Sequence, residues 1–255
     1  FLKQESIFIP ERLTSEYFKK YIKDVAAQAT IETIGFEFLE MKPDVKGIIR
    51  FTESFDGNGL EAALWYYYDE CRFAYTDAQL SKVFIKTDDQ NQIKVEKVSR
   101  NSGQERKMVT LIKQLGLVET VAKRWEKAEM QDPFETFYTL LHAKDRLLSA
   151  NISLEMPDWE GKRLYAGEYS IEELHVKLNQ DWFDLNLVII VGDEEIPFKA
   201  LLQHIKNNNR FYALQSGEIF IIPVTWFEQY EQLAAQCDLT GAIPKLAKSR
   251  FSVLE

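Results

Sequence analysis

The sequence has little of what disulfide-stabilised, metal-binding or membrane-spanning proteins need. It contains two cysteines, Cys71 and Cys237, and three histidines in 255 residues. Two cysteines so far apart form no disulfide framework, and no secretory signal is visible, so we expect a reducing, cytoplasmic location. No apolar run approaches the roughly 20 residues of a membrane-spanning helix. The apolar run at residues 185–191, for example, is only one strand long.

Motifs for common catalytic and cofactor sites are also missing. His142, His175 and His204 lie about 30 residues apart, with no cysteine or carboxylate at zinc-ligand spacing. There is no G-x-x-x-x-G-K-[ST] phosphate loop and no G-x-S-x-G nucleophile turn. We therefore predict no catalytic residue, no bound cofactor and no metal site in this segment.

Two groups of carboxylates leave one enzymatic alternative open. Asp181 and Asp184 flank an aromatic pair, and Asp193 stands before two glutamates after the next strand-like run. Such groups act as acid and base when burial separates their pKa values. Acids that follow a glycine in a turn are usually solvated, so a free-standing hydrolase is the least favoured of our hypotheses.

Charge is negative overall but unevenly distributed. The net charge is −9, with 20 basic and 21 acidic residues in 1–131 and 11 basic and 19 acidic residues in 132–255. Residues 82–127 hold 11 Lys and Arg against 6 Asp and Glu, which is the one local excess suited to a polyanion. If the chain contacts DNA phosphates, the candidate residues are Lys82, Lys86, Lys94, Lys97, Arg100, Arg106, Lys107 and Lys113.

The first part of the chain predicts hairpins and helices. Residues 48–55 and 60–68 are apolar or aromatic and are joined by Asp-Gly-Asn-Gly, a strong hairpin signal. Residues 31–41 predict a strand, and residues 83–86 and 93–98 predict a second hairpin. Thr14 is a candidate N-cap of one helix, and Asn101 or Ser102 of another that ends at Gly116.

The second part alternates strands and helices. Asp132-Pro133-Phe134-Glu135 predicts a helix start, followed by a helix to residue 149 and a strand near 152–156. Residues 169–179 predict a strand, with a short helix as the alternative. Residues 181–233 predict strand, turn, short strand, helix, hairpin and a helix from Val224. The expected fold is α+β, with mostly antiparallel sheets covered by helices, in sub-regions 1–131 and 132–255.

Four short motifs resemble the helicase-associated region of bacterial Swi/Snf-type helicases. They are Asp181-Trp182-Phe183, Ile196-Pro197-Phe198, Ala213-Leu214-Gln215-Ser216-Gly217 and Pro223-Val224-Thr225-Trp226. A looser upstream match places Arg100 and Glu105 before a helix that ends in a Leu-x-x-x-Gly-like step at residues 111–116.

This resemblance implies an accessory segment of a DNA translocase that hydrolyses ATP with Mg in two lobes encoded after residue 255. The abrupt ends at Phe1 and Glu255 fit a piece of a longer protein, in which Leu254-Glu255 need not be native. Expected partners are duplex DNA, through the parent, and the parent's own motor lobes. The segment would act as scaffold, regulator or DNA contact; docking on the lobes or another protein without DNA contact is the alternative.

Overall fold

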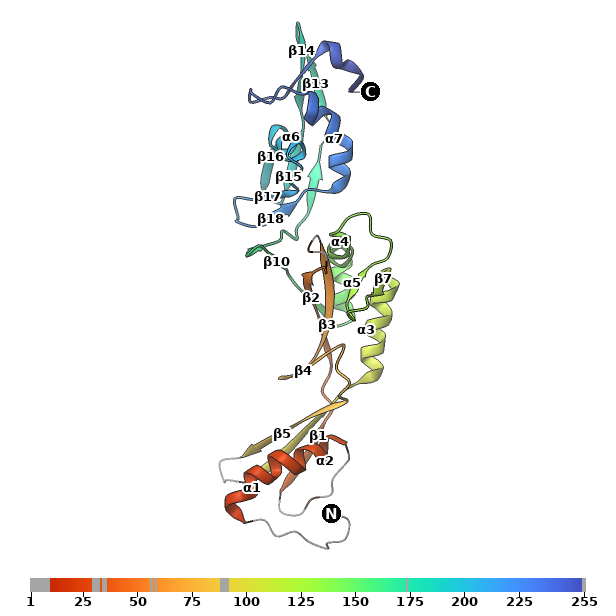
Figure 1. Ribbon diagram of the computed structural model, residues 1–255, viewed down its shortest axis with the longest axis vertical. Coiled ribbons are helices and arrows are strands. Elements are labelled where there is room, and N and C mark those ends of the chain that lie inside the picture. Colours follow the sequence, from red (N-terminus) through yellow and green to blue (C-terminus); the bar gives the residue numbers. More distant parts are fainter. Residues whose placement is uncertain are drawn as a thin grey trace. The chain divides into compact units, whose positions relative to one another are not determined.

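The chain folds into two units, Phe1–Glu155 and Met156–Glu255, in the computed structural model (Figure 1). The structure describes residues 10–28, 33, 36–55, 57, 59–87, 92–172 and 174–253. Helices and antiparallel-rich sheets alternate in both units, which confirms the predicted α+β class.

A six-stranded sheet, here called the central sheet, organises the first unit. Its strand order is β7-β8-β3-β2-β9. The sixth strand, β4, pairs with residues 65–68 of β3, whereas β8 pairs with β3 at Ala62. The predicted first hairpin is confirmed, because β2 and β3 pair antiparallel along their length. The strands are β2 Lys46–Glu53, β3 Leu60–Tyr68, β4 Cys71–Ala74, β7 Leu117–Glu119, β8 Trp125–Lys127 and β9 Ile152–Glu155.

Helices cover one face of this sheet. They are α3 Ser102–Gln114, α4 Glu135–His142 and α5 Lys144–Ser149 (Figure 1). Their apolar side chains form one core with the alternate residues of β3 that point to that side. The predicted helix 134–149 is divided at Ala143, and Gln131 N–H and Phe134 N–H donate to the Glu135 and Asp132 carboxylates at its start.

The unit boundary lies at 155/156 instead of the expected 131/132. β9 runs parallel to β2, with Gly47 opposite Ile152 and Arg50 opposite Glu155. The Leu140 and Leu147 side chains belong to the core of the first unit. A pairing between residues about 105 positions apart leaves no local signal, so residues 132–155 could not be assigned to the first unit from sequence periodicity.

A smaller sheet, the hairpin sheet, has the order β1-β6-β5. β5 Ser81–Thr87 and β6 Ile93–Ser99 form the predicted second hairpin, and β1 Glu37–Met41 runs parallel to β6. Residues 31, 32, 34 and 35 of the predicted strand 31–41 and residues 88–91 of the turn lie outside the described residues. One face of the sheet packs against the N-terminal helix through Phe18, Ala26, Val83 and Val95.

The N-terminal helix begins four residues earlier than predicted. α1 Glu11–Tyr17 follows Pro10 at the N-cap and continues through a π turn, Phe18–Ile22, into α2 Lys23–Gln28. Thr14 is therefore inside the helix, and its hydroxyl donates to the Pro10 carbonyl. Proline, with its fixed φ and no N–H to satisfy, replaces the hydroxyl cap that the sequence suggested.

The second unit has the predicted element order over residues 181–233. Its elements are β14 Trp182–Asn186, β15 Val188–Val191, β16 Glu194–Pro197, α6 Phe198–Lys206, β17 Phe211–Ala213, β18 Ile219–Ile221 and α7 Val224–Gln236. The apolar run 185–191 is divided between β14 and β15, which lie in different sheets, β13-β14-β19 and β12-β15-β16. The outer strands are β12 Tyr169–Ile171, β13 His175–Leu178 and β19 Lys245–Ala247, and 3-10 turns Lys248–Val253 follow. A short hairpin, β10 Asp158–Trp159 with β11 Lys162–Arg163, opens the unit.

Gly59 is the position where the first hairpin meets the start of α4. A Cβ at Gly59 would lie 2.2 Å from the Pro133 carbonyl oxygen, and Leu60 N–H donates to that same carbonyl at 3.2 Å. The nearest atoms are the backbone O and C of Pro133 and its Cβ, so no flexible side chain can move aside.

We predict that Gly59→Ala destabilises the first unit by about 2–4 kcal/mol, in the range of severe overpacking. Gly103→Ala is the matched control, because a Cβ there meets Asn101 Oδ1 at an ordinary 3.5 Å, and alanine favours a helix. Urea unfolding of both variants checks this; equal stability of the two would contradict the close contact.

Candidate nucleic-acid interface

The candidate cations divide between the hairpin sheet and α3. Lys82 and Lys86 lie on β5, and Lys94 and Lys97 lie on β6. Arg100 follows β6, and Arg106, Lys107 and Lys113 lie on α3. They belong to one unit, but their surroundings differ strongly.

α3 is fixed at both ends by local interactions. The Asn101 side chain accepts a hydrogen bond from Gln104 N–H at 3.1 Å, as an N-cap does. The helix ends at Gly116, whose φ of +79° is readily adopted by glycine. Glu105, Met108 and Ile112 form the buried face, at helical spacing.

The solvent face of α3 is basic. Arg106, Lys107 and Lys113 are exposed, and Glu105, the single acidic residue of the helix, points inward. Arg106 Nε donates to the Ser102 carbonyl, which holds the guanidinium on the outer surface of the helix. Three exposed cations with no acid on the same helix face form the strongest candidate contact for phosphates.

Arg100 is used inside the protein. Its side chain is 8% exposed and that of Glu105 is 9% exposed, and two guanidinium nitrogens donate to the Glu105 carboxylate at 2.9 Å. A third nitrogen donates to the Asp77 carbonyl at 2.6 Å. Burial alone lowers the pKa of Arg100, but the hydrogen bond and charge of Glu105 outweigh it and raise that pKa above its ordinary value. Arg100 is therefore set aside as a phosphate contact.

The Tyr68 hydroxyl completes this buried network. It donates to Glu105 Oε1 at 2.5 Å and accepts from Asn101 N–H at 2.7 Å. The guanidinium of Arg100 also lies over the rings of Tyr66 and Phe73, at 5.4 and 5.3 Å from their centroids. The network joins β3, β4, the segment after β4 and α3.

Two of the four hairpin lysines pair with carboxylates, and the other two are buried or bound to other groups. Lys86 Nζ lies 2.6 Å from Glu96, and Lys94 Nζ lies 3.3 Å from Glu37. Lys97 is buried at 8% exposure. Lys82 donates to the Arg72 carbonyl and lies over the Phe73 ring. The hairpin is therefore a weaker candidate for phosphate binding than α3.

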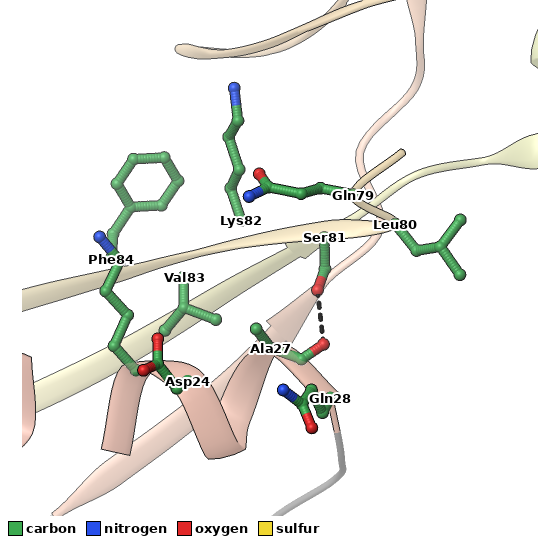
Figure 2. A pocket seen from close by; sticks show the side chains of 10 residues that line it. Asp24, Ala27, Gln28, Gln79, Leu80, Ser81, Lys82, Val83 and Phe84 are labelled. Atoms are coloured by element: carbon green, nitrogen blue, oxygen red, sulfur yellow. Dashed lines mark hydrogen bonds between the residues drawn. The ribbon is translucent and has the colours of Figure 1, made fainter. Parts of the chain in front are cut away.

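An open hollow of about 670 Å³ lies between α2 and the start of β5 (Figure 2). Its walls carry Lys23, Asp24 and Lys82, so opposite charges line it. The Ser81 hydroxyl donates to the Ala27 carbonyl at 2.9 Å and thereby joins strand to helix (Figure 2). That hydroxyl is thus engaged with the backbone.

The structure separates the two carboxylate groups. Asp184 lies on β14, and Asp193 lies in the turn between β15 and β16, in another sheet. Asp184 accepts from Asn179 Nδ2 at 2.6 Å and is in register with Lys177 and Lys245 on the neighbouring strands. Glu194 accepts from Gln215 N–H at 2.7 Å. Asp184 and Glu194 therefore have structural partners at two separate places, although Asp184 Oδ1 is buried without a hydrogen-bond partner among the described residues.

The histidines and cysteines are also dispersed. His204 Nδ1 lies 3.1 Å from the Asn209 carbonyl, and the His204 ring lies against Tyr212. Among the described residues, no three His, Cys, Asp or Glu side chains are grouped for a metal ion. Cys71 and Cys237 are free, buried and in different units. No helix in the described ranges has the length and apolarity to cross a bilayer.

The motif residues of the second unit are structural. Trp226 and Tyr230 on α7 pack in the core with Phe198 of α6. Pro197 and Pro223 are the N-caps of α6 and α7, and Gly217 adopts a φ of +87° in the turn before β18. Three of the four motifs thus mark helix starts, a turn and core positions. In the fourth, Asp181-Trp182-Phe183, Trp182 opens β14 and is 37% exposed, with Lys245 over its ring.

A family model described as "Bacterial SNF2 helicase associated" matches residues 1–246. The chain belongs to the bacterial SNF2 helicase-associated family. It is therefore a helicase-associated accessory domain of SNF2-type proteins, as the motifs predicted. No curated protein and no solved structure matches the chain.

We predict that Glu105→Ala destabilises the first unit by about 3–5 kcal/mol, because it leaves the Arg100 charge buried and unpaired. Glu155→Ala is the matched control. Its carboxylate pairs with Arg50 at 2.7 Å, but the side chains are 54% and 33% exposed, so a loss of at most about 1 kcal/mol is expected. Denaturant unfolding measures both; a similar cost would mean that the Arg100 network contributes no more than a surface pair.

We also predict slow thiol modification of the folded chain. Burial raises the pKa of Cys237 to about 11 and raises the pKa of Cys71, and the thiolate is the reactive form. In a Cys71→Ala variant, alkylation of Cys237 at pH 8 should be slower than in denaturant and should accelerate as pH rises toward 11. Equal rates in the folded and denatured chain would contradict this.

Proposed function

We propose that this chain is a non-catalytic accessory region of a SNF2-type, DNA-dependent ATPase and that it contacts duplex DNA through the exposed face of α3. Membership of the SNF2 helicase-associated family over residues 1–246 is the observation that carries the proposal. In this proposal the ATP, the Mg and the catalytic groups belong to motor lobes of the parent protein, and the chain acts in the cytoplasm.

The charge distribution on α3 supports DNA contact. Arg106, Lys107 and Lys113 face solvent, while Glu105, the acid of the same helix, is buried in an ion pair with Arg100. Clustered cations bind phosphate by releasing condensed counterions, and this makes the affinity salt-dependent. The contact would position the DNA without reading its sequence, because phosphates carry no sequence information.

A second candidate function is docking on the parent's motor lobes without DNA contact. β13 is an edge strand whose four residues are all exposed, including Val176 at 44% and Leu178 at 63%. An exposed apolar edge strand is suited to pairing with another protein segment. Lys245 is held in β19, so the hinge to the lobes would begin after that strand, in the 3-10 turns that carry Lys248 and Arg250.

The triple variant R106Q/K107Q/K113Q tests the DNA-contact proposal on the isolated chain. Titration of a labelled DNA duplex should give salt-dependent, micromolar binding, and the variant should reduce the slope of log K against log salt by about 0.9 for each lost phosphate contact. K162Q/R163Q/K206Q, which removes the same charge from exposed positions of the second unit, is the control. No salt-dependent duplex binding, or equal losses in both variants, would refute α3 contact.

Deletion of residues 1–240 from the parent separates the two candidates. Docking predicts a changed basal ATPase rate with little change in DNA affinity, whereas α3 contact predicts weaker DNA stimulation that R106Q/K107Q/K113Q reproduces. If the deletion changes neither the ATPase rate nor its DNA stimulation, both the gating and the accessory role are wrong.

A further inference from the structure

The central sheet has a second face, opposite the helices. In β3, Leu64, Tyr66 and Tyr68 are buried in the helix-covered core. Trp65 and Tyr67 alternate with them, so they point to the other face, where they are partly exposed. The aromatic residues of β3 therefore supply both a core and an open surface.

Basic side chains surround these two rings. The register places Lys46 of β2 and Arg72 of β4 on either side of Tyr67. The guanidinium carbons of Arg50 and Arg72 lie 5.6 and 5.7 Å from the centroid of the Trp65 ring. We call this surface the aromatic platform: Lys46, Arg50, Trp65, Tyr67 and Arg72.

The charge on the platform is positive. Arg50 is paired with Glu155 at 2.7 Å and donates to the Tyr67 hydroxyl at 3.0 Å, so it is held against the rings. Lys46 and Arg72 are exposed beside the rings. Glu155, at the β9 side, is the one acid that the register places next to the platform on that strand. The platform's own three cations have four acids near them: Glu155, which pairs with Arg50, Glu61, which lies near Arg124 on the same face of β3, and Asp69 and Glu70 in the turn after β3. Lys46 and Arg72, exposed beside the rings, are the groups suited to an anionic partner.

We propose that the aromatic platform binds single-stranded nucleic acid, with bases stacked on Trp65 and Tyr67 and phosphates held by Lys46 and Arg72. Aromatic rings and guanidinium planes stack on unpaired bases, and adjacent cations track the backbone. Residues two apart in a strand lie about 6.6 Å apart, roughly twice the 3.4 Å base spacing of a stacked strand, so each ring receives its own splayed base. Duplex bases are already stacked and offer no such face.

This surface is separate from the α3 contact. α3 packs on the covered face of the central sheet, and the platform lies on the opposite face. The two proposals therefore fail independently: loss of α3 cations should weaken duplex binding, and loss of the platform should weaken single-strand binding.

The test is fluorescence anisotropy of the 255-residue chain with labelled oligo-dT and oligo-rU of about 15 nucleotides, near the upper site size of one sheet-based module. We expect salt-dependent binding of oligo-dT, oligo-rU or both, and the ratio of the two affinities assigns the strand to DNA or RNA. Trp65→Leu keeps an apolar side chain but removes the ring, and should weaken binding on the order of tenfold or more. Arg72→Gln should weaken it and reduce the salt slope by about 0.7.

Trp159→Leu is the matched control, because this tryptophan stacks on Phe211 in the second unit. R106Q/K107Q/K113Q should leave oligonucleotide binding intact. Thermal unfolding verifies that each variant is folded. If Trp65→Leu does not fold, the binding of Arg72→Gln, a change at an exposed position, tests the platform instead. The proposal is overturned if neither oligonucleotide binds in the micromolar range, or if the platform variants bind as tightly as Trp159→Leu. Binding of the motor lobes at this face without any binding of nucleic acid would also overturn it.

Discussion

The buried ion pair between Arg100 and Glu105 is the constraint on which the first unit depends. A charge taken out of water is tolerated only when its partners are complete, and here Tyr68, Asn101 and the Asp77 carbonyl complete them. The pair joins the end of β6 to the first turn of α3 and holds both against the aromatic residues of β3 and β4. Because the geometry is fixed at Glu105, the rotation of α3 about its axis is fixed as well.

That rotation decides which charges meet solvent. Glu105 and Arg106 are adjacent in sequence, but about 100° of helical turn separates them, so one is buried and the other exposed. On the hairpin, two like charges are neighbours instead: Lys86 and Lys94 face each other across the strands. Glu96 pairs with Lys86 and Glu37 with Lys94, and these pairs relieve the repulsion between the lysines. A count of basic residues over 82–127 does not distinguish these positions. The packing does: Arg100 is in a buried ion pair, Lys86 and Lys94 pair with carboxylates, and the cations of α3 are exposed to solvent.

Local signals predicted the local structure well. The two hairpins, α3 and the order of elements from β14 to α7 follow from turn residues, caps and alternation, which act over a few positions. The parallel pairings of β1 with β6 and of β2 with β9 could not be predicted. The paired strands are far apart in the sequence, and no local pattern marks which strands pair. The boundary at residue 155 and the internal use of Arg100 depend on those long-range contacts. The solvent face of β3 was equally hidden, since Trp65–Tyr68 read as one aromatic run until the strand gave alternate residues to opposite faces.

The residues that reveal the family are those that build the fold. Pro223 is the N-cap of α7, and Trp226 in the first turn packs in the core. Gly217 adopts a backbone angle suited to glycine, and Arg100 and Glu105 satisfy each other's charge. None of these groups is presented to a ligand. A family resemblance carried by caps, turns and core positions therefore establishes how the chain folds, and what the domain touches must be sought on surfaces that folding leaves free. In the first unit, these are the outer side of α3 and the uncovered face of the central sheet.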